Sequence, residues 1–175
     1  MTRTIVVSGA PGTGKSTIAA AIATDLALPL LSLDEIKEAL ADVLGLGGED
    51  WSNRVGDAAA EVVFRLVRSF PAAVAEGWWR RERRTRAIEE FAGSVEVFCR
   101  CEPDLARQRA TARLDGARHP IHRDVINPAL ADAAGEVAAS VEPLRLGGRL
   151  VEVDTTAGDD LDRVLREVRS AFATS

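Results

Sequence analysis

The stretch VVSGAPGTGKST, Val6 to Thr17, begins as a short apolar strand and continues as glycines followed by a lysine, a serine and a threonine. Its second half, Gly9 to Ser16, matches the phosphate-binding loop pattern, which requires a strand before it and a helix after it. The glycines let the backbone turn so that successive N–H groups face phosphate oxygens at the start of that helix. The residues predicted to contact phosphate are Gly9, Gly12, Thr13, Gly14, Lys15, Ser16 and Thr17.

Two side chains of this loop predict chemistry as well as binding. Lys15 can reach the β- and γ-phosphates of a nucleotide, and Ser16 can ligate magnesium. A nucleotide and Mg²⁺ are therefore the expected ligands of this end of the chain.

The apolar runs predict strands that alternate with helices, a pattern typical of a parallel sheet covered on both faces. Each run is short and is followed by a polar or glycine-containing segment. The predicted strands are Arg3 to Ser8, Leu28 to Leu33, Ala72 to Glu76, Val95 to Cys101 and Leu150 to Val153.

Helices are predicted where apolar residues recur every three or four positions. A flexible join, Gly45 to Asp50, is expected between the second and third of them. The predicted helices are Lys15 to Leu26, Glu35 to Leu44, Asn53 to Ser69 and Asp160 to Phe172.

Glycine and proline interrupt the region from Leu114 to Gly148 so often that a tight alternation of strand and helix is excluded there. This composition predicts a lid built from short helices. No repeat or low-complexity tract is present, so residues 1–175 are expected to form a single α/β domain.

The overall composition limits the class of partner. The chain has 175 residues, of which 46% are hydrophobic and 28% charged, and its net charge is −5. This charge argues against binding nucleic acid through the overall field, although a local basic patch could still do so. A small substrate is favoured, and the sequence leaves the oligomeric state open.

No segment predicts targeting or membrane insertion. Residues Met1 to Thr4 lead directly into the first strand, and polar residues and a proline interrupt the longest apolar region, Ile18 to Leu33. Cys99 and Cys101 alternate along a predicted strand and are expected to be buried, reduced thiols. These features predict a cytoplasmic protein without contact to a membrane.

Other classes of phosphate-loop protein are excluded by missing motifs. A GTPase needs an Asn-Lys-x-Asp motif, which the sequence lacks, and motor or transporter ATPases need a much longer chain. The acidic LLSLDE stretch, Leu30 to Glu35, lies too close to Lys15 to be the acidic strand of such an ATPase. It is interpreted instead as the second strand of a βαβ unit.

With these residues in view, the sequence resembles small P-loop kinases of the chloramphenicol phosphotransferase, zeta toxin and polynucleotide kinase type. Shikimate, gluconate and adenylate kinases are more distant relatives. Besides the loop, the resemblance rests on Asp34 after the second strand, on AVAEGWWRR, Ala73 to Arg81, and on LARQRATAR, Leu105 to Arg113.

The resemblance implies a three-layer αβα fold with a five-stranded parallel sheet in the order 2-3-1-4-5 and a helical lid. It also implies transfer of phosphate from ATP to a hydroxyl group, with Mg²⁺ as cofactor. The region expected to face the acceptor, Gly45 to Arg54, matches no substrate motif.

Two carboxylates are candidate site residues because each follows a strand at the carboxyl edge of the sheet, where open α/β sheets bind ligands. Asp34 can accept the proton of an attacking hydroxyl or hold magnesium through water. A helix N-cap is the alternative role for Asp34. Glu76 can bind a magnesium-bound water or orient the substrate, and its alternative role is an ion pair with an arginine.

Arginines in the predicted lid are candidates for contact with the nucleotide. Arg109 and Arg113 lie four residues apart and therefore share one helix face. Arg113 and Arg118 are predicted to stabilise the negative charge of the transferring phosphoryl group, and Arg109 is predicted to bind the nucleotide.

The acceptor is expected between Asp34, Arg54 and Trp78. The stretch WWRRERRTR, Trp78 to Arg86, combines aromatic and basic residues, which suits a polynucleotide end as well as a compact phosphorylated substrate. A solvated helix surface is a third interpretation of this stretch.

Three functions follow. The first is an ATP- and Mg²⁺-dependent kinase acting on a hydroxyl of a small molecule such as an antibiotic, a sugar acid or a metabolite. The second is a kinase for a nucleotide or a polynucleotide 5′-hydroxyl. The third is a nucleotide-binding sensor that acts through a protein partner.

Overall fold

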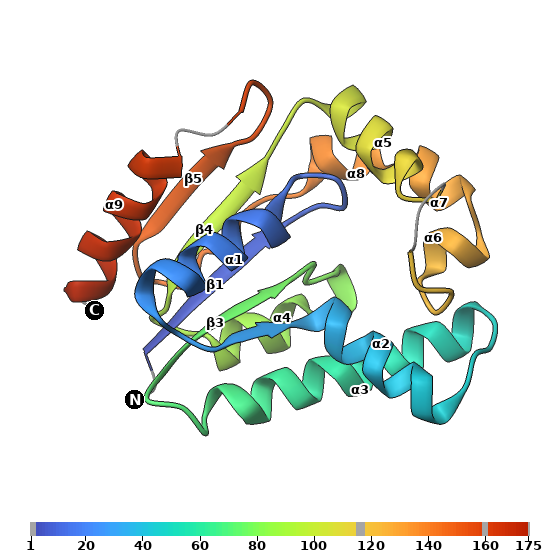
Figure 1. Cartoon of the computed structure of the whole chain (residues 1–175), viewed down its shortest axis with the longest axis horizontal. Helices are drawn as coiled ribbons and strands as arrows, with labels where there is room; N and C mark the ends of the chain where they lie inside the picture. The colour runs from blue at the N-terminus through green and yellow to red at the C-terminus, as the bar shows by residue number, and fades with distance from the viewer. Residues whose placement is uncertain (1–2, 115–117, 159–160, 175) are drawn as a thin grey trace.

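The centre of the fold is a five-stranded parallel sheet with the strand order β2-β3-β1-β4-β5 (Figure 1). The computed structural model describes residues 3–114, 118–158 and 161–174. The predicted sheet, including its strand order, is confirmed. The strands are β1 (Arg3–Gly9), β2 (Leu30–Ser32), β3 (Ala72–Gly77), β4 (Val95–Arg100) and β5 (Leu150–Asp154).

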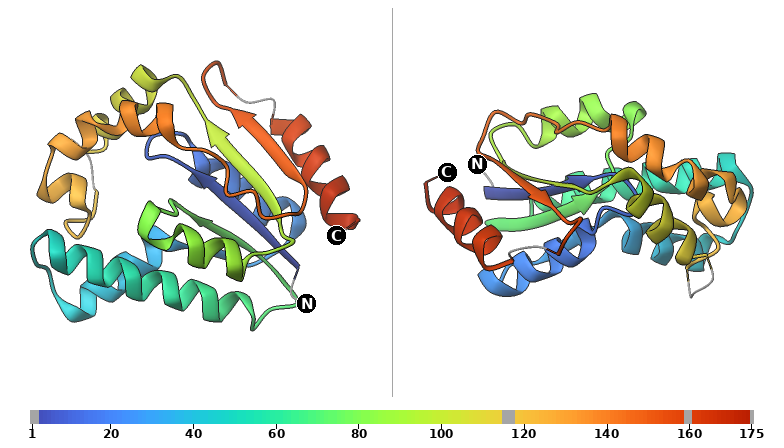
Figure 2. Two further views of the ribbon diagram at one scale, coloured as in Figure 1. Left: turned by 180° about the vertical axis from the view of Figure 1, so that it is seen from behind. Right: turned by 90° about the horizontal axis from the view of Figure 1, so that it is seen from above.

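Helices cover both faces of this sheet and extend beyond one end of it (Figure 2). Among the described residues, none of the helices combines the length and the apolar content needed to cross a membrane. The helices are α1 (Lys15–Leu26), α2 (Leu33–Leu44), α3 (Glu49–Val67), α4 (Arg81–Glu90), α5 (Pro103–Ala112), α6 (Arg123–Ile126), α7 (Ala129–Asp132), α8 (Ala134–Ser140) and α9 (Leu161–Ala173).

Two apolar clusters hold the layers together. On one face, β1 and β4 pack against α1 and α9 through residues such as Ile5, Ile22 and Val164. On the other face, the sheet packs against α3 and α4, where Trp79 lies in contact with the rings of Phe64 and Phe91. Burial of apolar surface on both faces explains why the central strands are almost continuously hydrophobic.

Several element boundaries differ from the sequence-based expectation. The helix predicted from Asn53 begins at Glu49, so the expected flexible join ends earlier than Asp50. Glu49 and Asp50 occupy the first turn, where carboxylates interact favourably with the helix dipole. Helix α4 was not predicted because its surface is almost entirely charged and gives no apolar period. Residues 115–117 of the predicted lid and Asp160, the predicted start of the last helix, lie outside the described residues.

The segment predicted as a lid divides into two parts with different environments. Helices α6, α7 and α8 stand beyond the carboxyl ends of the strands (Figure 1), whereas the chain near Leu144 lies against the sheet. The buried carboxylate of Glu96 on β4 accepts hydrogen bonds from the backbone N–H groups of Leu144 at 2.7 Å and Arg145 at 2.8 Å. The hydroxyl of Ser8 on β1 also donates to Glu96, at 3.0 Å. The last residues of the predicted lid therefore belong to the body of the domain.

Replacing Glu96 by alanine is expected to destabilise the protein by about 3 kcal/mol, because two N–H groups and a hydroxyl lose their common acceptor. Urea unfolding followed by circular dichroism measures this change. The matched control is Glu152→Ala, at an exposed position of the neighbouring strand β5, for which the free energy of unfolding should stay within about 0.5 kcal/mol of the wild type. Equal stability of the two variants would contradict the role assigned to Glu96.

Candidate active site

The phosphate-binding loop joins β1 to α1 at the carboxyl edge of the sheet. Gly14 caps α1 with a φ of 76°, and Gly12 has a φ of 84°, both in the left-handed region that favours glycine. A side chain at Gly12 would collide with the carbonyl group of Ala106 on α5. The loop therefore needs glycine at this position for close packing as well as for its turn, and the N-terminus of α1 is directed as an anion site requires.

Glu76 on β3 contacts both the end of β2 and the start of α1. Its buried carboxylate accepts hydrogen bonds from the hydroxyls of Ser16, at 3.2 Å, and Ser32, at 3.0 Å. The Nζ atom of Lys15 lies 3.8 Å from Oε1 of Glu76. The alternative role for Glu76, an ion pair with an arginine, is thus wrong: among the described residues its ion-pair partner is this lysine. Hydroxyl and carboxylate oxygens suit magnesium, directly or through water, so Ser16 and Glu76 fit the predicted cation.

Asp34 is the second residue of α2 and lies beside this group. The helix is capped by Ser32, whose Oγ accepts a hydrogen bond from the backbone N–H of Glu35 at 3.4 Å. The alternative role of Asp34 as an N-cap is therefore wrong. Its carboxylate is about half exposed. Burial raises the pKa of Asp34, but the positive charges around it, led by that of Lys15, outweigh burial and bring the pKa below its usual value of 3.8.

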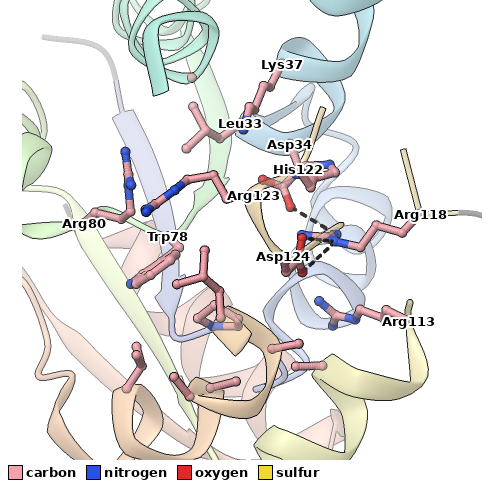
Figure 3. Close-up of a pocket in the computed structure, with 18 of the residues that line it drawn as sticks. Leu33, Asp34, Lys37, Trp78, Arg80, Arg113, Arg118, His122, Arg123 and Asp124 are labelled. Atoms are coloured by element: carbon pink, nitrogen blue, oxygen red, sulfur yellow. Dashed lines mark hydrogen bonds and ion pairs between the residues drawn. The ribbon is translucent and has the colours of Figure 1, made fainter. Parts of the chain in front are cut away.

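Lys15 and Asp34 line one wall of a cavity of about 140 Å³ that lies between the sheet edge and helices α6 to α8 (Figure 3). Apolar side chains from α7 and α8 also line the cavity; these are Leu130, Ala131, Ala134 and Val137. Seven lining residues carry a positive charge and two carry a negative charge; these are Lys15, Lys37, Arg80, Arg83, Arg113, Arg118 and Arg123, and Asp34 and Asp124.

The two predicted catalytic arginines both reach this cavity. Arg118 is held by Asp124, with its Nε 2.9 Å from Oδ1, and its Nη1 lies 3.9 Å from Oδ2 of Asp34. Among the described residues, Arg113 has no carboxylate within ion-pair distance, and burial followed by the charge of Arg118 lowers its pKa. Arg113 also lines a second cavity, beside Gly14, so it stands between the phosphate loop and the pocket that contains Asp34.

Arg109 lies on the other side of the phosphate loop. Its guanidinium donates hydrogen bonds to the hydroxyl and the carbonyl of Thr155, both at 3.0 Å, and to the carbonyl of Gly12 at 3.5 Å. Arg109 and Thr17 line the second cavity together. This position agrees with contact to a nucleotide rather than to an acceptor.

The two remaining predicted substrate contacts have different outcomes. Trp78 lines the pocket and turns its ring toward it (Figure 3). Arg54 is exposed, lies over the ring of Trp51 at 5.6 Å, and is not among the residues that line the pocket. The pocket-facing side of α3 carries Asn53 and Gly56 instead. The expectation for Arg54 is thus not supported by the geometry.

Carboxylates on one face of α2 bind side chains from the segment that precedes α6. Asp34, Glu38 and Asp42 follow one another at intervals of four residues, so they share one helix face. Nε2 of His122 lies 2.6 Å from Glu38, and Nε2 of His119 lies 3.0 Å from Asp42. Together with Arg118 on Asp34, these contacts fix the acceptor side of the predicted lid on α2.

Four cationic pocket residues were not named individually as candidates: Lys37, Arg80, Arg83 and Arg123. Arg80 and Arg83 belong to the basic stretch Trp78 to Arg86 that the sequence analysis singled out, whereas Lys37 and Arg123 were missed. Signals for two of the four are present in the sequence. Lys37 lies three residues after Asp34 and so faces the same way on a helix, and it interrupts an otherwise apolar stripe. Arg80 directly follows the strand that carries Glu76. Arg123 gives no such signal, because it depends on how α6 is placed in space.

The sequence from residue 5 to residue 134 matches a family model described as an AAA domain. The chain belongs to this family. The matched part of this AAA domain runs from β1 to the start of α8, and it contains the phosphate loop, Asp34, Glu76 and all of the cationic pocket residues.

The AAA domain is also similar to proteins described as kinases. A shikimate kinase from Bradyrhizobium diazoefficiens is 31% identical over 121 residues, and the match spans 65% of this chain and 56% of that kinase. The crystal structure of a presumed kinase from Chloroflexus aurantiacus J-10-fl is 33% identical with a TM-score of 0.84, covering 97% of this chain and 98% of that chain. A gluconokinase from Sinorhizobium meliloti 1021, 20% identical, shares the fold with a TM-score of 0.60 and coverage of 99% and 92%. The resemblance to small P-loop kinases is thereby confirmed.

Proposed function

We propose that this protein is an ATP- and Mg²⁺-dependent kinase that transfers the γ-phosphate to a hydroxyl group of a small molecule. The observation that carries the proposal is that Lys15, from the phosphate loop, and Asp34, an ionised carboxylate, line the same cavity. A cavity of about 140 Å³ suits a compact acceptor better than a polymer. The kinases among the similar proteins support the same reaction.

Each group in the cavity has a role in this reaction. The acceptor hydroxyl oxygen bonds to the γ-phosphorus, the bond from that phosphorus to the bridging oxygen breaks, and ADP leaves. Asp34 accepts the hydroxyl proton. Ser16 and Glu76 would hold Mg²⁺, which supplies positive charge to the phosphates. Lys15, Arg113 and Arg118 stabilise the charge that spreads over the phosphoryl oxygens.

The part of the chain carrying α6 to α8 is proposed to act as a helical lid of a single domain. Exclusion of water by such a lid strengthens every charge interaction at the transferring group. Because α2 holds its acceptor side, closure would bring mainly the nucleotide side, with Arg113, toward the phosphate loop.

The basic stretch Trp78 to Arg86 gives little support to the alternative function, a polynucleotide 5′-hydroxyl kinase. Arg84 donates hydrogen bonds to the backbone carbonyls of Glu142 and Pro143, and Arg86 pairs with Glu90. These arginines are used within the fold instead of forming an open track for phosphates.

A nucleotide-binding sensor remains the alternative from another class, and turnover distinguishes it. The purified protein with Mg²⁺-ATP should release ADP slowly alone and at least about tenfold faster with an accepted hydroxyl compound. A coupled ADP assay over a panel of sugar acids, polyols, antibiotics and 5′-hydroxyl oligonucleotides measures this. A sensor would show no acceleration by any of them, and acceleration by oligonucleotides alone would favour the polynucleotide kinase.

A cytoplasmic location is part of the proposal. It is supported by Cys99 and Cys101, which are both buried and not joined in a disulfide.

A further inference from the structure

One wall of the pocket gathers positive charge that the transfer of phosphate from ATP does not require. We call Lys37 on α2, Arg80 at the N-cap of α4, Arg83 on α4 and Arg123 on α6 the cationic wall. Arg80 and Arg123 extend toward the same part of the pocket, beside Trp78, whereas Arg113 lies on the other side of Asp34 (Figure 3). The cationic wall therefore faces the acceptor and not the phosphate loop.

Lys37 is the most deeply buried member of this wall. Its side chain is only 8% exposed, and its Nζ donates one hydrogen bond, to Oγ of Ser52 at 2.8 Å. In the described part of the chain, no carboxylate lies within ion-pair distance of this ammonium, which has three N–H donors. Burial lowers the pKa of Lys37 to about 8, so it remains mainly protonated at pH 7. A buried ammonium with unused donors calls for an acceptor from outside the chain.

The arginines of the cationic wall repel one another. Burial and the charges of Arg83 and Arg123 lower the pKa of Arg80. Among the described residues, the only carboxylate within ion-pair distance of Arg80 is that of Glu82, which is 4.0 Å away and mostly exposed. Arg83 pairs with Asp57 and Arg123 with Glu49, yet Nε of Arg123 is buried without a hydrogen-bond partner. An anion placed between these guanidinium groups would relieve both the repulsion and the missing bond.

Asn53 lacks a hydrogen-bond donor, whereas the cationic wall lacks an acceptor. Its Oδ1 is buried at the same pocket without a partner. An amide oxygen accepts hydrogen bonds, so a ligand hydroxyl at this point would satisfy it. A ligand that bonds to all of these groups is therefore one compact molecule that carries both negatively charged oxygens and a hydroxyl donor.

We propose that the acceptor is a small hydroxy acid whose carboxylate or phosphate ester group binds between Lys37, Arg80, Arg83 and Arg123 while its reacting hydroxyl faces Asp34. This inference rests on the proposed kinase function and narrows its substrate class. Neutral acceptors, such as an uncharged antibiotic, leave the cationic wall unpaired and are rejected. The negative group also fixes the orientation of the acceptor, because it anchors the end away from the γ-phosphate.

The first test measures anion binding without catalysis. The protein is saturated with Mg²⁺ and a non-hydrolysable ATP analogue, which occupies the phosphate loop, and is titrated calorimetrically with inorganic phosphate and, separately, with D-gluconate. We expect saturable binding of at least one of them, weakened roughly ten- to a hundredfold in Lys37→Met and in Arg80→Gln. The matched control is Arg65→Gln, an exposed arginine on α3 outside the pocket, which should bind as the wild type does.

Melting temperatures accompany these titrations. Lys37→Met should melt at or above the temperature of the ligand-free wild type, since the substitution removes a charge whose burial is unfavourable. If that variant does not fold, anion binding is compared between the wild type and Arg80→Gln, because the side chain of Arg80 is less tightly buried. Absence of anion binding to the nucleotide-loaded wild type, or unchanged binding in both variants, would overturn the inference.

The second test compares a negatively charged acceptor with a neutral compound of the same carbon chain. Glycerol 3-phosphate is compared with glycerol, and D-gluconate with D-glucitol, by kcat/KM in the coupled ADP assay. The charged member of an accepted pair should be preferred by at least about tenfold. Equal kcat/KM for the charged and the neutral acceptor would refute the proposal that the substrate is a hydroxy acid, but not the proposal that the protein is a kinase. Anion binding without phosphate transfer to any hydroxyl would instead refute the kinase proposal, but not the anion site.

Discussion

Replacing Lys15 by alanine is expected to lower kcat/KM for ATP by at least about 10³-fold while leaving the fold intact. Lys15 is a buried residue at the start of α1, where the phosphate-loop pattern places its ammonium at the β- and γ-phosphates. Loss of a single charge-stabilising donor in an enclosed site costs about 10²–10³ in rate, and weaker nucleotide binding adds to this loss.

The fold should survive because Glu76 keeps its hydrogen bonds from Ser16 and Ser32 after Lys15 is removed. Turnover is measured in the coupled ADP assay, binding by titration with the ATP analogue, and folding by circular dichroism. Arg65→Ala, an exposed substitution, serves as the control for handling and purity. Turnover near the wild-type rate in Lys15→Ala would remove the kinase assignment.

Replacing Asp34 by asparagine is expected to lower kcat about 10²- to 10⁴-fold with little change in ATP affinity. Asparagine keeps the shape of the side chain but cannot accept the proton of the attacking hydroxyl. Because the pKa of Asp34 lies below 3.8, the wild-type carboxylate stays ionised throughout the neutral range. Mild acidification to pH 6 should therefore leave wild-type turnover largely unaffected and should not imitate the variant.

The capping geometry supplies a matched comparison for this variant. Ser32 caps α2, so Asp34→Asn should leave the melting temperature unchanged, whereas Ser32→Ala should lower stability by about 1 kcal/mol. A variant Asp34→Asn that melts early but turns over normally per folded molecule would show that this carboxylate is structural only.

The sequence predicts the sheet and its phosphate edge well because both depend on local patterns. The phosphate loop between β1 and α1 follows from glycine spacing and from one apolar strand. Glu76 and Asp34 could be placed beside the loop because the carboxyl ends of parallel strands share one edge of the sheet.

The acceptor side could not be predicted in the same way, as Arg54 illustrates. Neighbouring residues on a helix point about 100° apart, so an error of one position selects a different face of the helix. Arg54 does not line the pocket, and Asn53 takes the place that was expected for it. The side of α3 that faces the pocket is set by how the helix packs, which a local sequence pattern does not locate.

Lys37 and Arg123 show a second reason why the acceptor side could not be predicted from the sequence. A lysine within a helix is ordinarily interpreted as part of the solvated surface, and only the packing of α2 against α3 buries Lys37. Arg123 reaches the pocket because α6 lies across from Asp34, a relation between segments far apart in the chain. Neither relation leaves a periodic signal in the sequence.

The adjacent tryptophans at the end of β3 have a consequence for spectroscopy. Trp78 faces the pocket, whereas Trp79 is buried against the rings of Phe64 and Phe91, at centroid distances of 5.5 and 5.2 Å. Indole emission depends on the polarity around the ring, so the two neighbours report on different events. Emission from Trp78 should respond to occupancy of the pocket, and emission from Trp79 should change only when the core opens. With Trp51 replaced by phenylalanine, the protein carries an intrinsic optical sensor that separates ligand binding from unfolding without an added label.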